Sequence, residues 1–360
     1  MPTPPAFPTA LPAPRTPDPM SAPVLRWGVL GTGWIAERFV SSVQNHTRQR
    51  FTAVASRDAG RAKEFADRHG IPGSYGSYEE LVAAADVDVV YVATEHTAHL
   101  ACARLALEAG KHTLVEKPLA LDAAQATELA QLASARGLFC AEALWTFFLP
   151  RFDVVRQILD SGVLGDLHTV LADHGEHFAP GHRILRADLA GGPLLDLGTY
   201  PVSLATWVLG EPAEVLATGQ PHPAGVNGQI SAVLRAPAGN QAVVHTTLFS
   251  DTPTTATIAG GHATLTLPGP FYQPGDIHLT PSGGGTTLTY SEPHTAHEGL
   301  HFEAAEVARC VTEGSRETRL RPLEASITTL RAMDAIRTAC GIEFPDQPDA
   351  YAQSVIPTGL

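Results

Sequence analysis

The sequence has little of what marks secreted, zinc-binding or membrane proteins. It contains only four cysteines, and none belongs to a C-x-x-C pair: Cys102, Cys140, Cys310 and Cys340. We therefore expect buried thiols in a reducing cytoplasm, and neither a disulfide framework nor a zinc site. No run of eighteen apolar residues occurs, which argues against a membrane-spanning helix.

Positive charge is also scarce. The 360 residues include 24 Lys and Arg against 37 Asp and Glu, a formal net charge of −13. Because a phosphate backbone attracts basic surfaces, this balance disfavours a nucleic-acid partner. A chain of this length with 44% hydrophobic residues can form two domains, each with its own core.

The N-terminal segment lacks periodicity and is rich in proline. We expect residues 1–22 to form a disordered tail, because proline-rich chain cannot continue a helix. The segment has no basic start followed by an apolar core, so it does not resemble a secretory signal. Met20 is a candidate for the true start residue.

A regular pattern begins at residue 25. Residues 25–30 predict a strand, 31–36 a tight turn, 36–43 a helix and 51–56 a second strand. Strand, glycine turn, helix and strand within about thirty residues form a βαβ unit.

The turn carries the pattern G-x-G-x-x-A. Gly31 allows the turn, Gly33 allows backbone to approach a pyrophosphate, and Ala36 allows the helix to pack closely on the strand. Between a strand and a helix this pattern predicts dinucleotide binding. The residues expected to contact the cofactor here are Gly31, Thr32, Gly33, Trp34 and Ile35.

The end of the second strand bears on which dinucleotide binds. An NAD site commonly has an acidic residue there, whereas this chain has Ser56 and Arg57. A hydroxyl and a guanidinium suit a 2′-phosphate. The alternative is that Arg57 is solvated and Asp58 binds the ribose. We favour NADP, with NAD also possible.

Helices and strands continue to alternate as far as residue 142, with further strands expected at 87–93, 112–116 and 138–142. The pattern predicts a doubly wound parallel sheet of the Rossmann type over residues 23–145, with its crevice at the strand C-termini. Thr94, Glu116, Lys117 and Glu142 are expected to emerge there, with Lys117 facing the nicotinamide. Cofactor contacts are expected from Thr94, His96, His99, Glu116 and Lys117. The bond between Lys117 and Pro118 is a candidate for a cis peptide.

The character of the sequence changes after about residue 150. Strand-like segments rich in Thr, Val and Gly recur at hairpin spacing, and helices are expected at 153–161, 297–312 and 322–340. Residues 146–360 are thus predicted to form an α+β domain with a large, mostly antiparallel open sheet that binds substrate and mediates oligomerisation.

A glycine-rich stretch at 191–201 places Asp196 four residues before Tyr200. The two share a helical face only if the helix has begun at Asp196; otherwise they merely meet at its entrance. Tyr200 is a candidate general acid, although a tyrosine at a helix start is commonly half-buried packing.

Five segments, in this order and at these separations, resemble the Gfo/Idh/MocA oxidoreductases, a family named for glucose–fructose oxidoreductase and inositol dehydrogenase: GVLGTGWIA, ATEHTAHL, VEKPLAL, AEALWTFFLP and GGPLLDLGTYPVSLA. The sequence is most similar to the branch of dimeric dihydrodiol dehydrogenases and NADP-dependent xylose dehydrogenases. The resemblance covers about residues 25–341. It implies a Rossmann domain and a second domain whose open sheet often forms a homodimer contact.

The resemblance implies catalytic roles for Lys117, Tyr200 and Asp196. A phenol with a pKa near 10 is a weak base, and a nearby lysine cation can stabilise its phenolate and polarise the substrate oxygen. Two features depart from the family pattern. The branch often has a basic residue in the stretch 145–148, where Phe147 is expected to make the pocket wall more apolar, and many relatives have proline at the position of Glu95.

Substrate contacts are expected from Lys117 and Tyr200 and from four further residues: Trp145, Phe147, His177 and Arg183. The stretch 173–177 invites a metal interpretation, but His174 and His177 would point to opposite faces of a strand, so no metal is expected.

The sequence thus predicts an NAD(P)-dependent oxidoreductase acting on a hydroxyl or carbonyl of a sugar, cyclitol or related diol. Two alternatives remain: a catalytically silent nucleotide-binding sensor or structural subunit, and an enzyme that keeps its cofactor bound while two substrates alternate.

Overall fold

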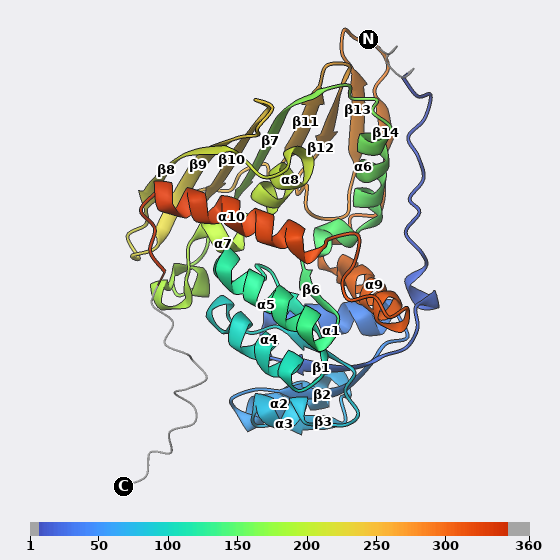
Figure 1. The fold of residues 1–360 in the computed structure, drawn as a ribbon, viewed down its shortest axis with the longest axis vertical. Coiled ribbons are helices and arrows are strands. Elements are labelled where there is room, and N and C mark those ends of the chain that lie inside the picture. Colours follow the sequence, from blue (N-terminus) through green and yellow to red (C-terminus); the bar gives the residue numbers. More distant parts are fainter. Residues whose placement is uncertain (1–6, 345–360) are drawn as a thin grey trace. The chain divides into compact units, whose positions relative to one another are not determined.

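The computed structural model describes residues 7–344. This part of the chain forms two compact units, both drawn in Figure 1. The first unit consists of Asp18–Leu144 and Leu300–Ile327, and the second of Trp145–Gly299, Thr328–Glu343 and residues 7–17. Residues 300–327 therefore belong with the N-terminal unit and interrupt the second domain predicted over 146–360, and residues 345–360 of that prediction lie outside the described range.

The first unit is built on a six-stranded parallel sheet. Its strands lie in the order β3-β2-β1-β4-β5-β6, which confirms the predicted doubly wound arrangement. Their bounds are β1 Arg26–Leu30, β2 Arg50–Ala55, β3 Gly73–Tyr75, β4 Val89–Val92, β5 His112–Glu116 and β6 Cys140–Ala143.

Helices cover both faces of this sheet. From β1 to β2 the chain moves toward one edge of the sheet, and from β4 to β5 it moves toward the opposite edge. Because both crossovers are right-handed, α1 and α4 lie on opposite faces. Helix α9 packs against α1, and α4 packs beside α5 (Figure 1). The helices are α1 Trp34–His46, α2 Ala59–His69, α3 Tyr78–Val82, α4 His99–Glu108, α5 Ala123–Arg136 and α9 His301–Thr312.

The second unit contains an eight-stranded sheet in the order β14-β13-β12-β11-β7-β10-β9-β8. Strands β7 and β10 pair in parallel, and the other neighbouring pairs within the described residues are antiparallel, so the predicted mostly antiparallel sheet is confirmed. The strands are β7 Leu167–Gly175, β8 Glu214–Pro221, β9 Asn227–Arg235, β10 Gln241–Thr247, β11 Ala256–Gly260, β12 Ala263–Leu267, β13 Ile277–Pro281 and β14 Leu288–Tyr290.

The two faces of this sheet differ in burial. Side chains on the inner face are buried and form rows across the strands, such as Leu234, Ala242, Val170, Ile258, Leu265 and Leu279. Helix α8 (Thr199–Leu209) packs on this face against β7 and β10, and α6 (Pro150–Asp160) and α10 (Leu323–Ala339) also belong to the helical layer seen in Figure 1. The residues that alternate with these along each strand point to the outer face, and most of them are partly exposed or exposed.

The N-terminal segment contributes contacts that its composition did not predict. Arg15 binds Asp153 of α6 through its backbone N–H at 2.6 Å and its guanidinium at 2.9 Å. The side-chain amide of Gln157 donates to the carbonyl oxygen of Ala13 at 2.9 Å. Residues 7–22 thus make defined contacts where the sequence suggested a disordered tail, and residues 1–6 of that prediction lie outside the described range.

Three of the four cysteine side chains are buried as expected, while Cys340 is only partly buried, and all four are unpaired. No helix among residues 7–344 combines the length and apolar content that crossing a membrane requires.

Candidate active site

The glycine turn lies at the carboxyl end of β1, between β1 and α1. Gly31 has a φ of +102°, and a Cβ there would lie 2.4 Å from the carbonyl oxygen of Ala93, so only glycine fits. A Cβ on Gly33 would enter open space. Gly33 is also the N-cap of α1 and offers no side-chain cap to its first N–H groups. Open space beside uncapped N–H groups suits a bound pyrophosphate.

The three residues that follow β2, Ser56, Arg57 and Asp58, make different contacts. The Asp58 carboxylate caps α2, accepting from the N–H groups of Gly60 at 2.8 Å and Arg61 at 3.2 Å. Ser56 is buried, and its hydroxyl accepts from the Asp58 N–H at 3.3 Å. The Arg57 side chain is 75% exposed. Since Asp58 is engaged in capping, Arg57 is the residue here better placed to meet an incoming ligand.

The ends of β4 and β5 are joined by His99. Its ring is fully buried, with Nδ1 2.8 Å from the carbonyl oxygen of Pro118 and Nε2 3.2 Å from that of Thr94. His99 was expected to contact the cofactor directly; in the structure its two nitrogens bridge backbone carbonyls at adjacent strand ends. His96 is likewise buried, with its ring 5.6 Å from that of His99.

Lys117 follows β5 directly and is half-buried. Its backbone N–H donates to Glu116 Oε2 at 3.1 Å, and the Lys117–Pro118 peptide bond is cis. Glu116 also accepts a short hydrogen bond from the Tyr91 hydroxyl. Its buried carboxylate is therefore held by protein donors, so Glu116 fixes the backbone that carries Lys117.

A second set of buried charges lies in the same unit. Glu142 accepts from the Arg321 guanidinium at 3.1 Å, from the Ser326 hydroxyl at 2.6 Å and from the Leu119 N–H at 3.1 Å. Glu303 of α9 is fully buried, and neither carboxyl oxygen has a hydrogen-bond partner among the described residues. Burial, with Glu116 and Glu142 adding to it, raises the pKa of Glu303 well above the ordinary value.

In the second unit, the predicted Asp196 and Tyr200 do not share one continuous helix. Asp196 ends the short helix α7 (Pro193–Asp196), and Tyr200 lies in the first turn of α8. Gly198 separates them, and a Cβ there would lie 2.6 Å from the Leu194 carbonyl oxygen. Both residues therefore lie at the entrance of α8 without sharing one helical face, which is the second of the two arrangements that the spacing allowed.

Asp196 is paired within its own unit. The Arg183 guanidinium lies 2.9 Å from Asp196 Oδ2, and the Asp196 side chain is largely buried. Arg183 was expected to bind substrate, and this expectation stays a prediction; in the structure its guanidinium pairs with the carboxylate of the motif. This pair ties the loop before the glycine-rich stretch to the end of α7.

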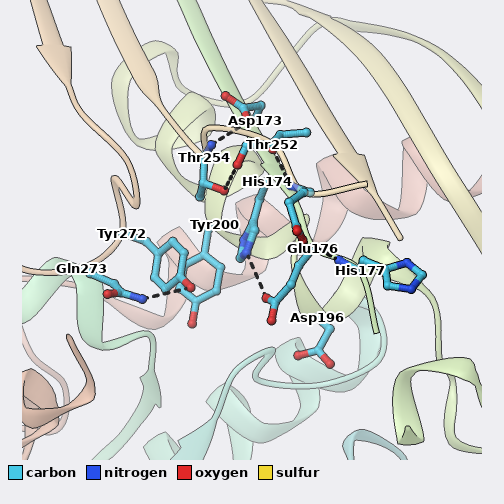
Figure 2. A network of polar contacts seen from close by, with 12 residues as sticks. Asp173, His174, Glu176, His177, Asp196, Tyr200, Thr252, Thr254, Tyr272 and Gln273 are labelled. Atoms are coloured by element: carbon cyan, nitrogen blue, oxygen red, sulfur yellow. Dashed lines mark hydrogen bonds and ion pairs between the residues drawn. The ribbon is translucent and has the colours of Figure 1, made fainter. Parts of the chain in front are cut away.

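Tyr200 lies in a cluster of aromatic side chains. The Trp145 indole N–H donates to the Tyr200 hydroxyl oxygen at 3.2 Å. Tyr272 stacks on Tyr200 with ring centroids 4.2 Å apart, and His174 stacks on Tyr272 at 4.9 Å (Figure 2). His297 stacks on Trp145 at 5.3 Å. This aromatic cluster, defined by Trp145, His174, Tyr200, Tyr272 and His297, surrounds the candidate acid with flat apolar and imidazole surfaces.

Two further residues predicted to contact substrate are Phe147 and His177. The Phe147 ring is buried against Phe152 and Trp207, at 5.5 Å and 5.3 Å. His177 is exposed, and the Asp251 carboxylate accepts from its backbone N–H at 2.9 Å. Phe147 therefore packs the core beneath α6 and α8.

Sequence reasoning considered His174 only as a metal ligand, and it did not name Tyr272 or His297 as site residues. His174 is 3% exposed, and its Nδ1 has no partner within the described residues, while Nε2 lies 3.8 Å from Glu176 Oε2 (Figure 2). The alternation on β7 could have placed His174 on the buried face with Val170 and Ala172. Tyr272 lies in the loop before β13, where no periodic signal exists. No group of three or more potential ligands in residues 7–344 is arranged to hold a metal.

Comparison with known proteins finds a matching family model in each of the two units. Residues 25–143 match the family described as "Oxidoreductase family, NAD-binding Rossmann fold", and residues 152–266 match the "GFO/IDH/MocA C-terminal domain". The chain belongs to the Gfo/Idh/MocA oxidoreductase family. The predicted resemblance is thus confirmed, and this Gfo/Idh/MocA protein is an oxidoreductase with an NAD(P)-binding Rossmann domain.

Among curated relatives of this Gfo/Idh/MocA protein is the trans-1,2-dihydrobenzene-1,2-diol dehydrogenase of Bos taurus. It is 35% identical over 333 residues, which cover 89% of this chain and 98% of the relative. The Homo sapiens enzyme of the same name is 33% identical, with the same coverage.

Solved structures agree with this assignment. KijD10, a 3-ketoreductase from Actinomadura kijaniata in complex with NADP and TDP-benzene, has a TM-score of 0.78 at 30% identity and covers 88% of this chain and 98% of its own. Levoglucosan dehydrogenase, in complex with NADH and levoglucosan, has a TM-score of 0.80 at 17% identity, covers 91% of this chain and 100% of its own, and supports the fold alone.

Proposed function

We propose that this protein is an NADP-preferring dehydrogenase or reductase that acts on the CH–OH or carbonyl group of a sugar, cyclitol or related diol. The proposal rests on what each unit contains by itself: the first has a nucleotide-type glycine turn and Lys117 at the end of β5, and the second has Tyr200 within an aromatic cluster. The relatives named as diol dehydrogenases and the sugar ketoreductase support the substrate class.

The residues at the glycine turn fit a dinucleotide. A bound nicotinamide cofactor would accept or supply the hydride. The open space at Gly33 and the N-terminus of α1 would receive the pyrophosphate, and Arg57 would pair with a 2′-phosphate. The engagement of Asp58 in capping α2 supports NADP over NAD.

Tyr200 would move the proton at the reacting oxygen. During reduction its phenol donates a proton to the carbonyl oxygen, and during oxidation its phenolate removes the hydroxyl proton. The Trp145 N–H donates to the Tyr200 hydroxyl oxygen. A donor in this position stabilises the phenolate, because hydrogen bonding to a charged form favours that form.

Lys117 would supply positive charge at the same step. An ammonium group lowers the pKa of a neighbouring phenol and polarises a carbonyl oxygen, and both effects lower the barrier. The anchoring of its backbone through Glu116 and Pro118 supports a role that demands a fixed position. Asp196, paired with Arg183, would hold the entrance of α8 in place.

The aromatic cluster supports a polyol substrate. Flat side chains bind the apolar faces of a sugar ring or a diol ring, and imidazole groups can hydrogen-bond hydroxyls. His174 and His297 bring such groups next to Tyr272 and Trp145. Phe147 and His177 were also predicted to bind substrate, and these assignments remain to be tested by substitution.

The test begins with a nicotinamide-fluorescence titration with NADPH and NADH, followed by reduced-cofactor absorbance with aldoses, inositols and diols. We expect Lys117→Met and Tyr200→Phe each to lower kcat by about 10²- to 10⁴-fold while leaving nucleotide affinity within a fewfold. Lys63→Met on α2 and Tyr290→Phe are matched controls. Nucleotide binding without turnover of any substrate in the panel would favour a silent nucleotide-binding protein.

We also infer that the outer face of the second sheet binds a second copy of the chain. A row of apolar side chains crosses four adjacent strands on this face: Leu216, Val233, Val243 and Leu171. Leu216 is 62% exposed, and Val243 and Leu171 are also exposed. A contiguous exposed apolar stripe is typical of protein contacts. Light scattering should show a dimer that Val243→Asp converts to a monomer; a monomeric wild type would contradict the inference.

A cytoplasmic location stays a prediction from the sequence.

A further inference from the structure

Two charged residues lie on either side of the glycine turn. In the first sheet β2 and β4 are the two neighbours of β1. Arg57 comes two residues after β2, and Glu95 comes three residues after β4. Because carboxyl ends of parallel strands meet at one edge, both residues emerge beside the turn that follows β1.

The two side chains form an ion pair across this edge. Arg57 Nη2 lies 3.1 Å from Glu95 Oε1. The Arg57 side chain is 75% exposed and that of Glu95 is 36% exposed. An exposed pair of this kind is weak, and water and salt can compete with it. A stronger anion that approaches Arg57 can therefore displace the carboxylate.

We propose that Glu95 is a cofactor-specificity residue: its carboxylate competes with the 2′-phosphate of NADP for Arg57 and thereby reduces the preference for NADP over NAD. This inference rests on the proposed function, in which Arg57 receives the 2′-phosphate.

Electrostatics give the direction of the effect. The 2′-phosphate carries a charge of roughly −1.5 to −2 at neutral pH. To bind it, Arg57 exchanges its Glu95 partner for the phosphate, and the released carboxylate then lies near a second anion. NAD presents a neutral 2′-hydroxyl, so its binding leaves the Arg57–Glu95 pair intact. Glu95 therefore opposes NADP and has little effect on NAD.

Glu95→Gln tests the proposal, because it removes the charge and keeps the shape. We expect the dissociation constant for NADPH to fall about threefold to tenfold at low salt, and that for NADH to change by less than about twofold. Raising the salt concentration should shrink the gain. The matched control is Glu128→Gln, which removes the same charge from the exposed Arg104–Glu128 pair between α5 and α4 and should change neither constant.

A second variant links the effect to Arg57. In an Arg57→Ala background, Glu95→Gln should give a smaller gain for NADPH, because most of the competition has gone. The proposal is overturned if Glu95→Gln leaves NADPH affinity unchanged, weakens it, or shifts both nucleotides equally. If the wild type binds neither nucleotide, the proposed function itself fails. That outcome differs from one in which both nucleotides bind but Glu95→Gln leaves the ratio of their dissociation constants unchanged.

Discussion

Arg151 allows the most quantitative prediction. Its guanidinium is fully buried at the start of α6 and donates to five backbone carbonyl oxygens of one loop, residues 268–276. Burial lowers the pKa of Arg151 to about 10, with Glu292 and Asp276 opposing the shift, so the side chain stays charged at neutral pH. The same loop carries Tyr272, which stacks on Tyr200.

Arg151→Lys keeps the charge but has only three donors, so at least two of the five carbonyls lose their partner. Each hydrogen bond to a charged group contributes about 1.5–3 kcal/mol, so the loss of two predicts a decrease of about 3–6 kcal/mol in the free energy of unfolding. At about 2–4 °C per kcal/mol, the Tm should fall by roughly 10 °C.

Scanning calorimetry measures this change directly. Arg235→Lys is the control, because that guanidinium is exposed and pairs with Glu214, and its Tm should stay within about 2 °C of wild type. Below the transition, kcat should also fall for Arg151→Lys, since Tyr272 is held less firmly against Tyr200. A Tm for Arg151→Lys within about 2 °C of wild type would refute the idea that these carbonyls depend on the guanidinium.

Three further predictions concern the first unit. Burial raises the pKa of Glu303, so the folded state is favoured while the carboxyl is protonated and loses stability as pH rises through that pKa. The difference in Tm between Glu303→Gln and wild type should therefore grow in favour of the variant between pH 5 and pH 8. A difference that stays constant with pH would contradict this prediction. Gly31→Ala should abolish nucleotide binding in the fluorescence titration, because its Cβ would strike the Ala93 carbonyl. Arg321→Met should destabilise the protein by about 3–5 kcal/mol in urea unfolding, because the buried Glu142 carboxylate loses its cation partner, and Arg321→Met with Glu142→Leu should recover much of that loss.

Much of the fold could be predicted because its signals are local. The helix over Ala123–Arg136 begins after Asp122, which accepts from the Gln125 N–H, and ends at Gly137 with a φ of +67°. Both end signals are visible in the sequence. The strands of the doubly wound sheet are short apolar runs between such helices. Fold class and family therefore followed from residues close to one another in the chain.

Two strands were not predicted. β3 has only three residues, at the sheet edge, in a stretch whose Gly and Ser predict a turn. β13 does alternate, with buried Ile277 and Leu279, but it is short and ends in a turn-like run beginning at Pro281. Short strands at or near a sheet edge bury too few residues to leave a clear periodic pattern.

The site was predicted less completely than the fold. The motif residues Lys117 and Tyr200 were found from sequence, but the partners of Tyr200 come from distant segments: Trp145, His174 and Tyr272. Such contacts depend on how sheet and helices pack, which a sequence without relatives does not encode locally. The Arg183–Asp196 ion pair was not predicted either, although the two residues are only thirteen positions apart in the chain.

The division of the chain also affects how the protein is made. The buried partner of Glu142 is Arg321, which belongs to the segment 300–327 that completes the first unit. A ribosome releases that segment only after the whole second sheet has been synthesised. Until then Glu142 has no guanidinium beside it, and the face that α9 covers is open. The N-terminal half therefore cannot finish its core during its own synthesis, and an expression plasmid that stops near residue 144 would encode an unfinished unit.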